Sequence, residues 1–214
     1  MAAIFEALIL YVVLFLSGSS GQADGEAISV TTGGELYRMF IYTIPSLALI
    51  WYLLYRNSSL KWAAVKPRIS DLISAAIALP GLLLIGFSIA LISPYFSSIP
   101  QGPQVSSPSG VSAWLVLAFS CIATGYLEES FFRFYLLSLR EKMGLDQTKA
   151  VLVSTLLFSV CHIYEGPWGF LNAALSGILL SFIFIRYRSL HGIAISHGLY
   201  NIFVYAMGNS IYFS

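Results

Sequence analysis

The chain has 214 residues, of which 57% are hydrophobic and only 10% are charged, and its mean hydropathy is +0.80. A soluble domain of this length carries about 25% charged residues, so the composition excludes an ordinary soluble protein. The formal net charge of +1, without any Lys/Arg-rich run, argues against nucleic acid as a partner. We therefore expect a multi-pass integral membrane protein of a cell (inner) membrane, in contact with membrane lipid.

Seven apolar segments follow one another along the chain, and each predicts a membrane helix. A helix of ~20 residues, at ~1.5 Å per residue, crosses a hydrocarbon core of ~30 Å. The segments cover residues 4–16, 36–55, 72–92, 112–139, 149–162, 168–185 and 192–207. The polar stretch 18–35 and the Pro/Ser/Gly-rich stretch 93–110 are predicted to be loops. The predicted fold class is all-α, a polytopic transmembrane helical bundle of about seven helices.

The first apolar segment is either a retained membrane helix or a signal peptide. Glu6 lies within it and no Lys or Arg precedes it, which favours the retained helix. Nine of the eleven Lys and Arg residues fall in the connections after the second, fourth and sixth helices. Because such residues accumulate in cytoplasmic loops, we predict a cytoplasmic amino terminus, with Arg38 near the opposite membrane surface.

Two adjacent carboxylates and an arginine interrupt the fourth apolar segment. A charge in the hydrocarbon core costs at least ~2.5 to 3.5 kcal/mol, so Glu128, Glu129 and Arg133 need a pairing or functional reason to be there. At ~100° per residue, Glu129 and Arg133 stand one turn apart on one face and can form an ion pair. Glu128 points elsewhere and is predicted to act outside its own helix.

Heights along the helices predict that other polar residues meet Glu128. Glu128, His162 and Asn201 each lie 12 or 13 residues from the basic end of their segment, which places each ~18 to 20 Å from the same surface. His197 lies one turn below Asn201 on the same helix face, at ~13 Å. The sequence therefore predicts one polar layer of a carboxylate, two imidazoles and an amide.

Three motifs in this layer resemble the CAAX prenyl protease and bacteriocin-processing (CPBP) family of intramembrane proteases, also called type II CAAX prenyl endopeptidases or the Abi family. They are Glu-Glu-x-x-x-Arg at 128–133, Phe-x-x-x-His at 158–162 and His-x-x-x-Asn at 197–201. The resemblance covers about residues 112–205. We predict a CPBP-like catalytic helix bundle over 112–207, preceded by membrane helices and loops without a recognised motif over 1–111, in one integrated membrane domain.

The resemblance implies hydrolysis of a peptide bond in or near the membrane, with a peptide or a lipid-modified protein as substrate. It implies that Glu128 and His162 activate a water, and that His197 and Asn201 bind the oxyanion. The local chemistry agrees, because a carboxylate without an intrahelical partner suits a general base. An imidazole N–H and an amide NH₂ one turn apart also offer two donors to one oxygen.

Three further motif residues are expected to give structural support, namely Glu129, Arg133 and Phe158. For the metal, the family has been described both ways, and both alternatives stay open. Zn²⁺ or another divalent metal would take Glu128, His162 and His197 as ligands. That set would consume the free general base and one oxyanion donor, so we expect no metal in the reaction.

Two other classes of protein remain as alternatives. One is a non-enzymatic membrane protein, a transporter or a bacteriocin-immunity-type factor, that uses the same polar layer for protons or for packing. The other is a membrane transferase with Glu128 and the histidines as acid and base. No phosphate-cradling Gly loop, Gly-x-Ser-x-Gly elbow or His-Glu-x-x-His helix is present to favour the transferase.

Overall fold

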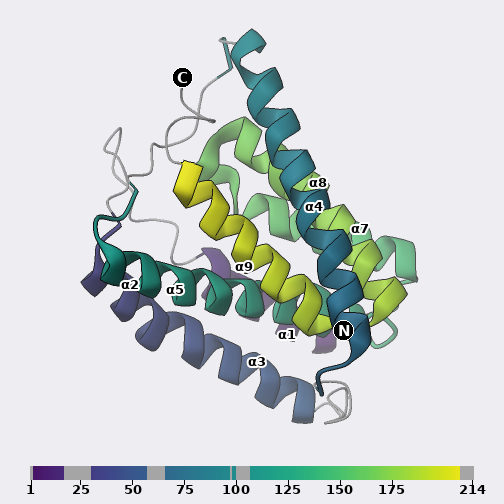
Figure 1. Cartoon of the computed structure of the whole chain (residues 1–214). Helices are drawn as coiled ribbons and strands as arrows, with labels where there is room; N and C mark the ends of the chain where they lie inside the picture. Colours follow the sequence, from purple (N-terminus) through teal and green to yellow (C-terminus); the bar gives the residue numbers. More distant parts are fainter. Residues whose placement is uncertain (1, 17–29, 57–65, 97, 100–106, 208–214) are drawn as a thin grey trace.

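The protein is described from a computed structural model that defines residues 2–16, 30–56, 66–96, 98–99 and 107–207 (Figure 1). The helical elements, in chain order, are α1 (Ala2–Tyr11), η1 (Val12–Leu16), α2 (Thr32–Tyr37), η3 (Arg38–Thr43), α3 (Ile44–Arg56), α4 (Ile69–Ile92), η5 (Ser93–Phe96), α5 (Val111–Glu129), η6 (Ser130–Tyr135), α6 (Leu136–Ser138), α7 (Gln147–Val160), η7 (Ile163–Glu165), α8 (Gly166–Tyr187) and α9 (Leu190–Met207). Contiguous elements join into seven helical segments within these ranges, where no strand occurs. The predicted all-α bundle is confirmed.

Four of the helical segments are long and apolar enough to cross a membrane. They are Thr32–Arg56, Ile69–Phe96, Val111–Ser138 and Ile163–Tyr187. Two shorter apolar helices, Ala2–Leu16 and Gln147–Val160, accompany them. Such surfaces, with many exposed large hydrophobic side chains, are those of an integral membrane protein.

The second membrane helix begins earlier than predicted. The side chain of Thr31 accepts a hydrogen bond from the backbone N–H of Gly34 and caps the helix that starts at Thr32. The prediction of a loop over 18–35 is therefore wrong for residues 32–35, and residues 17–29 lie outside the described ranges. Thr31 is a standard N-cap residue, and this start signal outweighs the two glycines that follow it.

The helices pack in a continuous series that brings α5 and α9 into direct contact. Helix α5 packs on α9, α9 on α4, α4 on α8, and α8 on α7 (Figure 1). The backbones of α5 and α9 touch where two glycines meet. A Cβ atom on Gly125 would lie 2.5 Å from the carbonyl oxygen of Ala194, and one on Gly198 would lie 2.7 Å from the Cα of Ile122. Small residues permit such an approach between membrane helices.

The first helix is part of the core. Ala7, Leu10 and Tyr11 of α1 are buried, and the Tyr11 hydroxyl donates to the carbonyl of Leu157 in α7 at 2.7 Å. The Tyr11 ring also lies 6.5 Å from the ring of Phe131 in η6, centroid to centroid. The segment predicted as a retained membrane helix is thus a packed helix that contacts two motif-bearing parts of the chain.

Two basic connections lie at the same end of the bundle. Arg68, just before α4, donates from Nη2 to the carbonyl oxygen of Arg188 at 2.8 Å. Arg188 adopts a left-handed backbone conformation, with φ of 52°, where α8 gives way to α9. The connections after the second and sixth helices therefore share one side, as the distribution of basic residues predicts.

We expect Gly125→Ala and Gly198→Ala to separate α5 from α9, because each added methyl group meets backbone atoms that cannot rotate away. Overpacking of this kind costs ~1 to 3 kcal/mol. Each variant should lower the Tm in detergent. Gly33→Ala is the matched control, since a Cβ there meets nothing within 4 Å. An unchanged Tm for both crossing variants would contradict the close contact.

Candidate functional site

The deepest charged residues of the protein are Glu129 and Arg133. Arg133 Nη1 lies 2.9 Å from Glu129 Oε1, and both side chains have 0% exposure. Glu129 ends α5, and Arg133 belongs to the π-helical turn η6. Turns of this kind are frequent at functional sites. The ion pair predicted from the spacing of the two residues is therefore formed, and it is completely removed from solvent.

His197 of α9 lies between the two adjacent carboxylates. Its Nδ1 is 2.8 Å from Glu129 Oε1, and its Nε2 is 3.5 Å from Glu128 Oε2. The side chains of His197 and Glu128 thus meet across the ~5 Å that separates their predicted heights. Heights of Cα atoms do not fix the positions of side-chain tips when two helices cross as closely as α5 and α9 do.

The contact with Glu129 decides which ring nitrogen of His197 carries a proton. An ionised carboxylate can only accept a hydrogen bond, so Nδ1–H donates to Glu129. A neutral imidazole has a single N–H, and Nε2 is then an acceptor. His197 can therefore donate from Nε2 only as an imidazolium.

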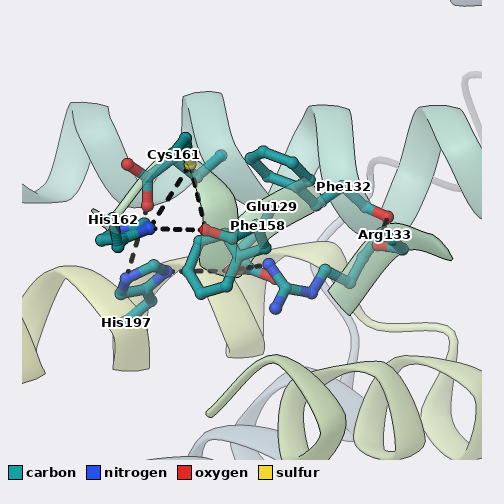
Figure 2. A network of polar contacts seen from close by, with 9 residues as sticks. Glu129, Phe132, Arg133, Phe158, Cys161, His162 and His197 are labelled. Carbon is teal, nitrogen blue, oxygen red and sulfur yellow. Dashed lines mark hydrogen bonds and ion pairs between the residues drawn. The ribbon is translucent and has the colours of Figure 1, made fainter. Parts of the chain in front are cut away.

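The ring of Phe158 fills the space between the charged pair and the two histidines (Figure 2). Its centroid lies 4.5 Å from that of His162 and 5.8 Å from that of His197. The guanidinium carbon of Arg133 lies 4.4 Å from the same centroid, a cation–π distance. Phe158 thus packs against three of the polar groups at once.

His162 lies just beyond the end of α7, in the turn that leads to α8, and not within the helix as predicted. Helix α7 has 14 residues and rises only ~21 Å, so its end lies inside a ~30 Å core. The chain reverses at Gly166, whose φ of 79° requires glycine, and Pro167 follows in the first turn of α8. This short hairpin holds His162 at the depth of the polar layer.

One ring nitrogen of His162 is committed to the backbone. Nδ1 lies 2.7 Å from the carbonyl oxygen of Phe158, which can only accept, so Nδ1–H is the donor. Nε2 of the neutral ring then carries the lone pair. His162 is therefore held in a form that can accept a proton at Nε2.

Glu128 and Asn201 have the fewest contacts among the predicted site residues. The Glu128 side chain is 14% exposed, and its Oε2 accepts no hydrogen bond from the described residues. The 3.5 Å approach of His197 is an ion-pair distance without hydrogen-bond geometry. Asn201 lies one turn beyond His197 on α9 and is half-buried. Within the described ranges its side chain shows no hydrogen bond, so contacts alone do not join Asn201 to the cluster.

The residues that the sequence offers as metal ligands are Glu128, His162 and His197. In the part of the chain that the structure describes, no three His, Cys, Asp or Glu side chains come together in a way that could hold a metal ion. His197 uses Nδ1 for Glu129 and His162 uses Nδ1 for a backbone carbonyl, so Nε2 is the remaining nitrogen of each ring. The expected absence of a metal stays a prediction.

The helical segment that carries the site, α5 with η6, is also held by polar contacts with the first two helical segments that the sequence does not predict. Tyr135 of η6 donates to Glu6 Oε1 at 2.6 Å, and Arg56 binds the other oxygen of Glu6 at 2.6 Å. Trp51 Nε1 donates to the Ser130 hydroxyl at 3.0 Å. The sequence feature that indicates these contacts is Glu6, a single glutamate within an apolar segment. A carboxylate in such a segment indicates a buried polar partner.

Arg133→Met is expected to leave Glu129 ionised and poorly paired in a dry environment, at a cost of ~3 to 5 kcal/mol. Glu129→Gln with Arg133→Met removes both charges and should recover a large part of that loss. Thermal unfolding in detergent measures both effects. Arg140→Met, at a partly exposed ion pair, is the control and should change stability by less than ~1 kcal/mol. A double variant as unstable as the single one would contradict the role of the stranded charge.

Comparison with known proteins gives one match. Residues 110–203 match the family described as Type II CAAX prenyl endopeptidase Rce1-like. No curated protein and no solved structure matches the chain. The matched region contains all three motifs, from Glu128 to Asn201, and the helices that carry them. Residues 110–203 are thus similar to the Type II CAAX prenyl endopeptidase Rce1-like family, and this similarity supports a CAAX-type protease at the level of the family.

Proposed function

We propose that the protein is an intramembrane endopeptidase that hydrolyses a peptide bond with a water activated by Glu128 and His162. The observation that carries this proposal is the position of His197, between a fully buried Glu129 and a half-buried Glu128. Two adjacent carboxylates thereby acquire different roles. Glu129 is neutralised by Arg133 and orients His197, whereas the Glu128 side chain is partly exposed and has no arginine paired with it among the described residues.

In the proposed reaction Glu128 accepts a proton from the water as its oxygen attacks the peptide carbonyl. A positioned carboxylate can act as a general base in this way. The new C–O bond gives a tetrahedral intermediate with a negative oxygen. In the proposal His162 takes this proton at Nε2 and passes it to the leaving nitrogen as the C–N bond breaks. The products are a carboxylic acid and an amine.

His197 stabilises the oxyanion in this proposal. Its imidazolium Nε2–H faces the Glu128 side of the cluster, where charge develops on the carbonyl oxygen. Glu129 fixes the ring through Nδ1, so the donor is in place before the reaction begins. Asn201, one turn along α9, supplies the second donor when its side chain turns to the substrate. A preorganised pair of donors is the usual means of stabilising such an intermediate.

The family match suggests the substrate class. CAAX-type substrates carry a prenylated cysteine followed by a short carboxyl-terminal tail. A membrane-embedded site suits them, because the lipid group remains in the hydrocarbon layer while the peptide reaches the polar cluster. We therefore propose a lipid-modified protein tail as substrate. We propose no metal, since a metal held by Glu128, His162 and His197 would occupy the general base and one oxyanion donor.

Glu128→Gln keeps the shape of the side chain and removes the base. We expect a folded protein whose peptide cleavage falls by at least ~100-fold, the usual contribution of a general base. The measurement is release of a fluorescent fragment from a farnesylated Cys-a-a-X peptide by purified protein. Glu141→Gln is the control, because Glu141 is exposed on the connection before α7. A transporter or scaffold that uses the same polar layer has no cleavage to lose, so absence of parental cleavage would reject the proposed function.

A metal-independent reaction predicts unchanged cleavage after treatment with a strong chelator and dialysis. Elemental analysis should then find less than one divalent metal per chain in active protein. The Glu128→Gln protein, assayed in parallel, gives the background cleavage rate of an inactive enzyme. Loss of activity with the metal, restored on adding Zn²⁺, would overturn this part of the proposal.

A further inference from the structure

Arg38 is the one basic residue that the sequence places near the opposite membrane surface, and the mechanism does not use it. It begins η3, and its Nη2 donates to Glu35 Oε2 at 2.6 Å and to the Ser120 hydroxyl at 2.9 Å. Ser120 donates to the same Glu35 oxygen at 2.6 Å. The guanidinium is therefore held firmly by one of its nitrogens, while 38% of the side chain stays exposed.

The other terminal nitrogen of Arg38 faces the catalytic part of α5. Nη1 lies 3.5 Å from the Thr124 hydroxyl oxygen, which is the limit of a hydrogen bond. The N–H groups of Nη1 can therefore still donate to another acceptor. Ser120, Thr124 and Glu128 follow at intervals of four residues and share one face of α5. Thr124 and Glu128 are both half-buried, so neither side chain is fully enclosed between Arg38 and the proposed base.

We propose that Arg38 and Thr124 bind the terminal carboxylate of the substrate peptide. This inference rests on the proposed function and names the feature of the substrate that the site recognises. Guanidinium and hydroxyl groups are strong donors to a carboxylate, and the Glu35 contact shows this preference within the protein. Glu35 and Ser120 are positioning residues, because they hold the guanidinium while Nη1 remains available.

The helix geometry sets the length of the tail. Thr124 and Ser120 lie four and eight residues before Glu128, which are rises of ~6 and ~12 Å. An extended peptide advances ~3.3 Å per residue. A carboxylate bound beside Thr124 and Arg38 therefore belongs to a substrate cleaved about two to four residues from its carboxyl terminus. Longer tails and internal peptide bonds would lack this contact.

The test compares farnesylated-cysteine peptides of one sequence that end in a free carboxylate or in an amide. The parent should cleave the acid with a KM about 10- to 100-fold lower, as expected for a charge-assisted hydrogen bond. Arg38→Gln should abolish this preference by raising the KM of the acid to that of the amide. Arg38→Gln combined with Glu35→Gln removes both charges and keeps the test valid if the single variant folds poorly. Arg56→Gln, at another exposed ion pair, is the control and should keep the preference.

The remaining outcomes distinguish failure of the carboxylate site from failure of the proposed function. Equal KM values for acid and amide in the parent, or a preference that survives Arg38→Gln, would overturn the carboxylate site while the protease proposal stands. If the parent cleaves neither peptide, the proposed function fails. Fluorescence anisotropy then measures the binding of the labelled acid and amide peptides to the Glu128→Gln protein, independently of cleavage. Equal Kd values for the two peptides would reject the carboxylate site. An effect of Arg38→Gln that appears only in vesicles with anionic lipid would instead assign Arg38 to a lipid phosphate.

Discussion

The structure depends on one constraint, which is that Glu129 and Arg133 are charged and completely buried. Removing two such ions from water costs several kcal/mol for each, and their mutual attraction offsets this only with good geometry and further partners. Those partners come from other helices. His197 of α9 binds Glu129, and the ring of Phe158 from α7 covers the guanidinium. Three helices are thereby fixed around a single ion pair, and the imidazoles are fixed with them.

The same pair separates two carboxylates that are neighbours in the chain. Adjacent residues on a helix point ~100° apart, so one faces the core while the other faces the edge of the cluster. Glu129, with a cation and an imidazole, has no capacity left on Oε1. Glu128 has neither a cation on its own helix nor a hydrogen bond to its Oε2 within the described residues. Equal side chains thus acquire a structural and a chemical role through their surroundings, as is usual where one site needs two carboxylates.

The sequence predicts the helices from the length of each apolar segment and the ion pair from the four-residue spacing of Glu129 and Arg133. Both predictions need only the rise and rotation per residue of a single helix. The sequence also predicts which helices carry the polar layer, since a common basic edge gives a common origin for the heights. It could not predict the bond between His197 and Glu129, which depends on how closely α5 and α9 approach at Gly125 and Gly198. Nor does any spacing rule reveal that Glu6 reaches Tyr135, since that contact links residues 129 positions apart.

The burial along α5 and η6 shows from which end Glu128 can be reached. Residues 129–137 are buried without interruption, and they include two phenylalanines that pack around the N-terminal helix. Before that stretch, Thr124 and Glu128 are half-buried on one face. Glu128 therefore stands at the junction between a closed and an open part of the same helix. A substrate approaching from the closed end would have to displace the most tightly packed part of the core, where each lost side-chain contact is costly. Thr124 lies on the side of α5 that η3 packs against, and Arg38 of η3 contacts it there, so the guanidinium stands one turn of α5 from the carboxylate.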